Sequence, residues 1–186
     1  VGGYNEAKGE YSTAFGFNNT IENNYAMAFG ENNTINEEGN YSMAVGSENI
    51  VKADQSMAVG MLNEISKEAS FAMAHGYGNE INGVFSIGLG IYNKLNGTAS
   101  TAIGFDNDID GDNSIALGLE NNITGDSSIA IGYGHQISGS NSGAFGDPTI
   151  IDGNNSYAVG NNNNIATTNL ITNILISFNH LQPHCL

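Results

Sequence analysis

The sequence lacks most of the residues that bind nucleic acids or anionic membranes. Among its 186 residues there is no Arg and there are only four Lys, against nineteen Asp and Glu, and the formal net charge is −15. Such a chain repels phosphate backbones and anionic headgroups. No apolar run reaches 18 residues, and no basic segment precedes an apolar one at the start. We therefore expect no nucleic-acid partner, no direct membrane insertion by this chain and no export signal of its own.

Cysteine is also scarce, because Cys185 is the only one and cannot form an internal disulfide. Leu, Ile, Val and Phe together make up 43 residues, which is above the level of disordered chains. Asn, with 29 copies, and Gly, with 25, are far more frequent than in an ordinary globular core. Some regular arrangement must therefore organise this polar chain.

An internal repeat supplies that regularity. Each copy ends in an anchor glycine that has a small residue two and four positions before it, and an aliphatic residue follows five positions after every anchor. Three positions after the anchor, nine of the eleven copies carry Asn. The steps between anchors are 14, 16, 14, 16 and then 14 six times. The anchors are Gly16, Gly30, Gly46, Gly60, Gly76, Gly90, Gly104, Gly118, Gly132, Gly146 and Gly160.

A 14-residue period with alternating segments predicts two short strands and two turns per coil. This is an all-β, parallel β-solenoid of about eleven coils. Gly and Asn between the strands supply the positive φ that tight corners require. The two 16-residue steps each place an extra residue pair at the same corner, around residues 38–41 and 68–71. Insertions at one corner are typical of loops.

The next question is which side chains point into the coil. Because burying small residues alone removes little apolar area from water, we predict that the bulky residues beside each small one point inward, with the aliphatic column. The predicted core is Ile21, Phe29, Ile35, Val45, Val51, Val59, Ile65, Ile81, Leu89, Ile103, Ile109, Leu117, Ile123, Ile131, Ile137 and Ile165. His75 also falls at such a position, and Gly143 leaves a gap there.

The small residues are then predicted to face outward and to form the seam with neighbouring subunits, because small side chains let backbones approach closely. The predicted interface residues are Ala14, Ala28, Ala44, Ala58, Ala74, Gly88, Ala102, Ala116, Ala130, Ala144 and Ala158. The alternative interpretation is that alanine merely fits a narrow roll.

The Asn column also has two interpretations, a ligand-binding ladder or a structural one. We favour the structural one, in which stacked amides bond the corner backbone and each other. His135 and Thr149 replace Asn in this column.

These repeats resemble the head repeats of trimeric autotransporter adhesins, typified by YadA, whose consensus runs Asn-Ser-Val-Ala-Ile-Gly. The segment Asn113-Ser114-Ile115-Ala116-Leu117-Gly118 shows it nearly verbatim, and residues 2–166 share the pattern. The resemblance implies a left-handed β-roll and a side-by-side homotrimer at the tip of a surface fibre. The same repeat occurs in bacteriophage fibre proteins. Gly88, Gly143 and His75 depart from the pattern.

The two ends differ in regularity. Gly2 and Asn5 extend the pattern backwards, so we expect further repeats or a cap upstream in a longer protein. We divide the chain into a β-roll head, residues 1–166, and a non-repeat tail, residues 167–186. In the tail, Ile171, Ile174, Phe178 and Leu181 have heptad spacing, which suits a neck coiled coil. A tail foreign to the parent protein is the alternative.

We find no enzyme constellation and expect no cofactor, because serines recur as repeat positions rather than beside a base. Two groups are weak metal candidates. His180, His184 and Cys185 have a spacing that suits zinc. Asp106, Asp108 and Asp110 resemble the start of a calcium loop, but the twelfth position is Leu117 instead of Glu.

We therefore expect a non-enzymatic adhesin head on the bacterial surface, a rigid trimeric rod that binds host matrix or cells through many identical sites. Tyr77, Tyr92, Phe105 and Tyr133 are candidate ligand contacts. A phage tail-fibre segment, carried on the virion, is the alternative. An ice-binding solenoid is less favoured, because no column supplies a regular Thr array.

Overall fold

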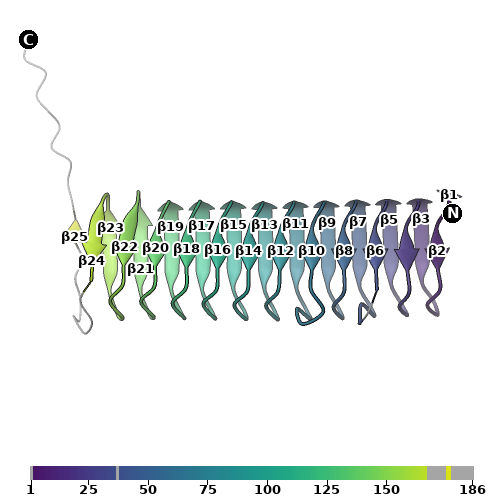
Figure 1. Cartoon of the computed structure of the whole chain (residues 1–186), viewed down its shortest axis with the longest axis horizontal. Helices are drawn as coiled ribbons and strands as arrows, with labels where there is room; N and C mark the ends of the chain where they lie inside the picture. The colour runs from purple at the N-terminus through teal and green to yellow at the C-terminus, as the bar shows by residue number, and fades with distance from the viewer. Residues whose placement is uncertain (1, 37, 167–174, 177–186) are drawn as a thin grey trace, which may run out of the picture.

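The computed structural model describes residues 2–36, 38–166 and 175–176, and these residues form a parallel β-solenoid. Its strands stack one above another along a rod (Figure 1), with every strand pair parallel and no helix among the described residues. No helix that could cross a membrane occurs in this part of the chain. The all-β solenoid prediction is confirmed.

Two sheets line opposite sides of each coil. The long sheet contains β1 (Gly2–Gly3), β3 (Thr13–Phe17), β5 (Met27–Glu31), β7 (Met43–Ser47), β9 (Met57–Met61), β11 (Met73–Tyr77), β13 (Ile87–Ile91), β15 (Thr101–Phe105), β17 (Ile115–Leu119), β19 (Ile129–Tyr133), β21 (Gly143–Gly146), β23 (Tyr157–Gly160) and β25 (Leu175–Ile176). The short sheet contains β2 (Glu6–Ala7), β4 (Thr20–Ile21), β6 (Thr34–Ile35), β8 (Ile50–Val51), β10 (Glu64–Ile65), β12 (Glu80–Ile81), β14 (Lys94–Leu95), β16 (Asp108–Ile109), β18 (Asn122–Ile123), β20 (Gln136–Ile137), β22 (Thr149–Ile151) and β24 (Asn163–Ile165).

The register follows the sequence repeat. Gly104 pairs with Gly118 and Gly118 with Gly132, and Ile109 lies beside Ile123 in the short sheet. Where the sequence step is 16, the extra residues leave the register intact, as the pairing of Ala58 with Ala74 shows. The predicted insertions are thus accommodated at a corner.

Left-handed backbone conformations occur at both corners, but Gly and Asn are not the only residues that adopt them. Tyr25, Glu48 and Leu62 have φ of 56°, 56° and 58°. The anchor glycines have φ between 117° and 136°, for example 130° at Gly118. A side chain added at Gly118 would lie 2.0 Å from the carbonyl oxygen of Gly132, so this column requires glycine for both conformation and space.

The interior differs from the prediction in one central respect. The aliphatic column is buried as expected, and its correctly predicted core residues are Ile21, Ile35, Val51, Ile65, Ile81, Ile109, Ile123, Ile137 and Ile165. The small residues are buried too. The predicted interface residues lie inside the coil, namely Ala14, Ala28, Ala44, Ala58, Ala74, Gly88, Ala102, Ala116, Ala130, Ala144 and Ala158. No neighbouring subunit can reach them, so the alanine seam is wrong.

The bulky residues beside them consequently point outward, and seven predicted core residues are exposed or half-buried: Phe29, Val45, Val59, Leu89, Ile103, Leu117 and Ile131. Gly88 shows the physical reason. A Cβ added there would lie 2.6 Å from Ile81 Cδ1 and 3.3 Å from Leu95 Cδ1. The aliphatic column of the short sheet already fills the space between the sheets, so the facing position has room for little more than a methyl group. The narrow-roll alternative is correct.

Candidate functional surfaces

The interior of the roll holds a ladder of amides. Asn121 donates through Nδ2 to Asn107 Oδ1 at 2.8 Å and to the Gly132 carbonyl at 3.1 Å, and its own Oδ1 accepts the His135 backbone N–H at 3.1 Å. The same pattern links Asn19, Asn33, Asn49, Asn63, Asn79 and Asn93, all of them buried. The structural interpretation of the Asn column is confirmed, because these amides bond the protein itself.

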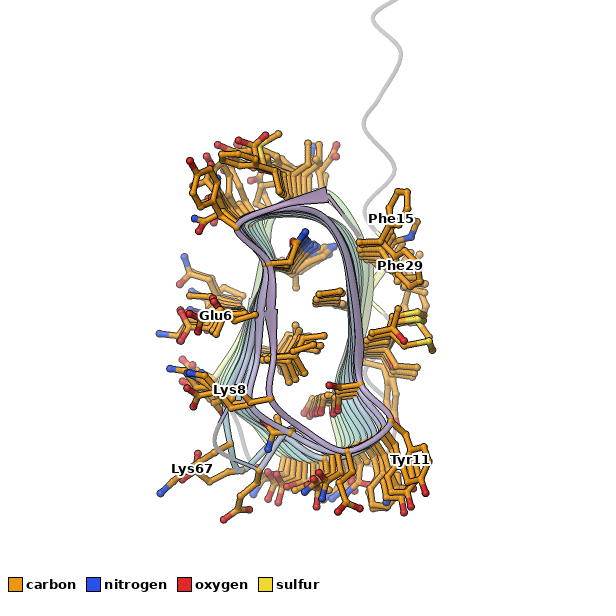
Figure 2. All side chains as sticks on the ribbon, turned by 90° about the vertical axis from the view of Figure 1, so that its right-hand side faces the viewer. Glu6, Lys8, Tyr11, Phe15, Phe29 and Lys67 are labelled. Carbon is orange, nitrogen blue, oxygen red and sulfur yellow. The ribbon has the colours of Figure 1, made fainter. Side chains whose placement is uncertain are left out.

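A second buried ladder is made by serines that the sequence analysis placed outside. Ser114 Oγ donates to the Gly125 carbonyl at 3.0 Å and accepts the Ser128 backbone N–H at 3.1 Å. Ser114 is fully buried. The two ladders occupy the inside of the roll in Figure 2, so neither offers a surface to a ligand.

The outward side of the long sheet is the most distinctive surface of the molecule, and we call it the apolar face. It comprises the residues three and one before each anchor glycine and one after it, and Figure 2 shows Phe15 and Phe29 on this side, with Glu6 and Lys8 on the opposite side. Its middle column consists of Phe15, Phe29, Val45, Val59, His75, Leu89, Ile103, Leu117, Ile131, Phe145 and Val159. Phe15 is 54 % exposed and Ile131 is 37 % exposed.

The apolar face is too large for an ordinary solvated surface. With about 4.8 Å between strands and about 3.3 Å per residue, its eleven strands of four or five residues cover about 50 Å by about 16 Å, or about 800 Å². The largest apolar patch of a typical monomer measures about 300–600 Å², whereas a standard protein interface buries about 800 Å² per partner. The face therefore has about the area that one partner contributes to a standard interface.

The short sheet presents a polar outward side. Its outward column is Glu6, Thr20, Thr34, Ile50, Glu64, Glu80, Lys94, Asp108, Asn122, Gln136, Ile150 and Asn164. The ion pairs among the described residues include Lys52 Nζ with Glu64 Oε1 at 2.9 Å and Lys8 Nζ with Glu6 Oε2 at 3.1 Å. A polar groove on this side is lined by Glu120, Asn122, Thr124, Gln136, Ile137, Ser138 and Asp152.

The three aspartates that suggested a calcium site do not converge. Among the residues that the structure describes, no three His, Cys, Asp or Glu side chains are placed to hold a metal ion. Asp110 Oδ1 instead accepts the Asn96 amide at 2.6 Å. Partial burial and the repulsion of Asp110 raise the pKa of the Asp108 carboxyl, while Lys94 opposes the shift. Asp106 lies at the corner, with a φ of 53°.

Aromatic side chains gather at the corner that follows the long sheet and beside it: the apolar face ends there at Tyr77, Phe105 and Tyr133, and Tyr92 occupies the corner itself, with a φ of 55°. Of the predicted contacts, Tyr77 and Tyr92 meet edge to face at 5.2 Å, Phe105 lies 6.4 Å from Tyr92, and Tyr133 is exposed. A hydrogen bond with Tyr77 raises the pKa of the Tyr92 hydroxyl. Sequence reasoning did not single out a second set at the other corner, where Tyr25 stacks on Tyr11 at 5.2 Å and on Tyr41 at 4.8 Å. The recurrence of aromatics five positions before the anchor was the available signal.

The two unusual histidines lie in different environments. His135, in the amide ladder, is fully buried, and burial lowers its pKa. His75, predicted to be in the core, is exposed in the middle column of the apolar face. The heptad residues of the tail and its candidate ligands His180, His184 and Cys185 lie outside the described residues.

Comparison with known proteins identifies the repeat. The family model of the YadA head domain repeat, which itself spans two copies of the repeat, matches four segments of the chain: residues 1–20, 38–62, 96–121 and 110–134. These segments carry the YadA-like head repeats that the resemblance indicated. A comparison with curated proteins gives no match.

Proposed function

Since the chain carries YadA head domain repeats, we propose that it forms the rigid rod of a cell-surface adhesin head, in which three copies lie side by side through their apolar faces. The single observation that supports this assembly is the apolar face, whose middle column carries an exposed or half-buried apolar side chain at every position except His75. Burying about 800 Å² of it per chain removes that surface from water at about 25 cal/mol per Å². The number three rests on the trimeric character of the family.

The proposed arrangement also favours one surface for binding. With the apolar faces turned toward each other, the short sheets and their corners face the surroundings, and each coil repeats a similar polar surface three times around the rod. Such repetition favours attachment by many weak contacts to a repetitive target on host matrix or cells. The fixed interior ladders keep the rod stiff, which holds these contacts in register.

The assembly is tested by comparing two variants, which place a negative charge on the outward side of the long sheet or of the short sheet in the same coil. Ile131→Glu puts a carboxylate in the middle column of the apolar face, whereas Gln136→Glu adds the same charge on the outward side of the short sheet. Sedimentation velocity is expected to give a trimer for the parent chain and for Gln136→Glu, and a monomer for Ile131→Glu. Circular dichroism is expected to show the strand content unchanged in all three.

The test of adhesion uses the same variants. Beads coated with the trimer are expected to attach to matrix deposited by cultured cells, and beads coated with Ile131→Glu at equal density are expected to lose most attachment, because avidity needs adjacent identical faces. A monomeric parent chain would refute the trimer. A trimer that fails to attach to matrix or cells would refute the adhesive role alone.

A further inference from the structure

One titratable side chain interrupts the middle column of the apolar face. His75 lies in β11 between Val59 of β9 and Leu89 of β13 in the middle column, and the other ten positions of that column are apolar. Among the described residues, neither ring nitrogen of His75 has a hydrogen-bond partner within the chain. The ring is exposed in the single chain, so water satisfies it there.

Assembly through the apolar face changes that environment. Covering the face removes the imidazole from water, and a buried polar group without a partner costs free energy. Val59 and Leu89, directly above and below, offer no polar atom. Within the middle column, only the other subunits or a bound species can therefore supply a partner.

Symmetry brings three copies of the residue together. Three parallel rods related by a three-fold axis place equivalent residues at the same height. The outward columns of each strand lie three and one before the anchor and one after it, so the middle column, which contains His75, is nearest the axis. Three imidazoles then converge between an apolar layer of Val59 side chains and one of Leu89 side chains.

We propose that the three His75 side chains of the trimer bind one divalent transition-metal ion of the zinc type on the three-fold axis; this inference rests on the proposed assembly. Three neutral imidazole nitrogens with a fourth position open to water form a known ligand set for Zn²⁺. Imidazole equally suits Ni²⁺ and Cu²⁺, whereas Ca²⁺ and Mg²⁺ require oxygen ligands. Each chain supplies one of the three ligands, so the site is complete only in the assembly.

Such an ion would fix the register of the three rods. The apolar face repeats along the rod, so neighbouring chains can slide by one coil while still burying bulky side chains. A single level of three histidines that share an ion penalises every register except one. This resembles the way a single polar layer sets register in coiled coils.

The experiment uses the full chain with Zn²⁺ as the probe, in a background where His180, His184 and Cys185 are replaced by Ala so that the tail contributes no ligands. After dialysis against Zn²⁺ and then metal-free buffer, elemental analysis is expected to give one zinc per three chains in the fraction that sediments as trimer. Substitution with Co²⁺ is expected to give the visible absorption bands of a four-coordinate site.

Two variants decide the assignment. His75→Val introduces the residue that the same column has at Val59. This variant is expected to remain a trimer but to bind no zinc. Zn²⁺ is expected to raise the dissociation temperature of the parent trimer and to leave that of His75→Val unchanged. His135→Asn changes the buried histidine instead and is expected to retain the zinc. A trimer without zinc, or zinc retained in His75→Val, would overturn the metal site and leave the assembly intact. A monomeric parent chain would overturn the assembly and the site with it.

Discussion

Each residue of the amide ladder supports the backbone of neighbouring coils, and Asn121 offers a matched test of its contribution. Asn121→Ala removes the donor to the Gly132 carbonyl and the acceptor of the His135 N–H. At about 1–3 kcal/mol for each of these two buried groups left without a partner, we expect a loss of about 2–6 kcal/mol of local stability. Native-state hydrogen exchange at β17 and β19 measures it.

Asn122→Ala is the control, because the adjacent residue points outward on the short sheet and is exposed. Its replacement is expected to change stability by less than about 0.5 kcal/mol. Equal effects of the two substitutions would contradict a buried ladder.

His135 is expected to make one coil of the rod less stable in acid. Burial lowers its pKa, and its Nδ1 lacks a partner among the described atoms, while Nε2 lies 3.2 Å from the Ile131 carbonyl. Because the unfolded chain, with a histidine pKa of about 6.5, takes up the proton more readily than the folded one, stability rises with pH, and the penalty appears as the pH falls below about 6.5.

His135→Asn is expected to restore the ladder and to remove this pH dependence. Thermal unfolding followed at pH 7.5 and pH 5 should show a smaller difference for His135→Asn than for the parent chain. Carboxylates such as Asp108 are the same in both proteins, so they cancel in the comparison. An identical pH response of the two proteins would show that His135 does not titrate on unfolding.

The side-chain sizes of adjacent residues explain why the sequence predicted the columns but not their direction. Alternation along a strand separates Ala116 from Leu117, yet it does not say which of them is inside. Assigning the larger residue to the core assumes a chain that stands alone. Here Ile109 and Ile123 of the short sheet already fill the roll, and Leu117 points outward. The distance between the sheets, which one sequence does not contain, decides the choice.

At the scale of the strand and its corner, glycine has two distinct roles. The anchor Gly118 has a φ of 130°, and a Cβ there would lie 2.0 Å from the Gly132 carbonyl oxygen. The corner residue Gly134 has a φ of 65°, and a Cβ added there would have Pro148 Cγ as its nearest neighbour, at 3.4 Å. Of these two positions, only the anchor admits no side chain. The corner position of Gly134, two residues after an anchor, is occupied in another coil by Asn18, which has a φ of 54°.

We therefore expect Gly118→Ala to cost more than about 3 kcal/mol, because backbone strain adds to a clash with a fixed backbone oxygen. Gly134→Asn is expected to be nearly neutral, because Asn tolerates the left-handed region and that substitution reproduces the residue found at other corners. Chemical denaturation followed by circular dichroism separates the two. A tolerated Gly118→Ala would mean that adjacent strands can separate at this column.

The strands and their pairing could be predicted from the sequence repeat, because equivalent residues of successive coils stack in register. The period, the parallel pairing and the buried aliphatic column all follow from positions that recur every 14 or 16 residues. The corner aromatics were harder to interpret. Tyr11, Tyr25 and Tyr41 stack because the corner holds them in equivalent left-handed conformations, a property that residue type alone does not indicate.

At the scale of the whole molecule, the proposed trimer must form against the repulsion between its negatively charged chains. Each chain carries a formal charge of −15, and the described ion pairs that involve Lys8, Lys52 and Lys67 are on the surface. Three such chains side by side repel one another, while the apolar face contributes attraction that does not depend on charge. Salt screens the repulsion over a Debye length of about 10 Å at 0.1 M and leaves the attraction in place.

Raising the NaCl concentration from 20 mM to 300 mM is therefore expected to strengthen the trimer, with at least a several-fold fall in its dissociation constants by sedimentation equilibrium. Sodium sulfate at equal ionic strength should strengthen it further, because sulfate also favours apolar burial. An interface held by ion pairs would behave in the opposite way and dissociate as salt rises. A trimer weakened by salt would thus place the contact on the charged short sheet instead of the apolar face.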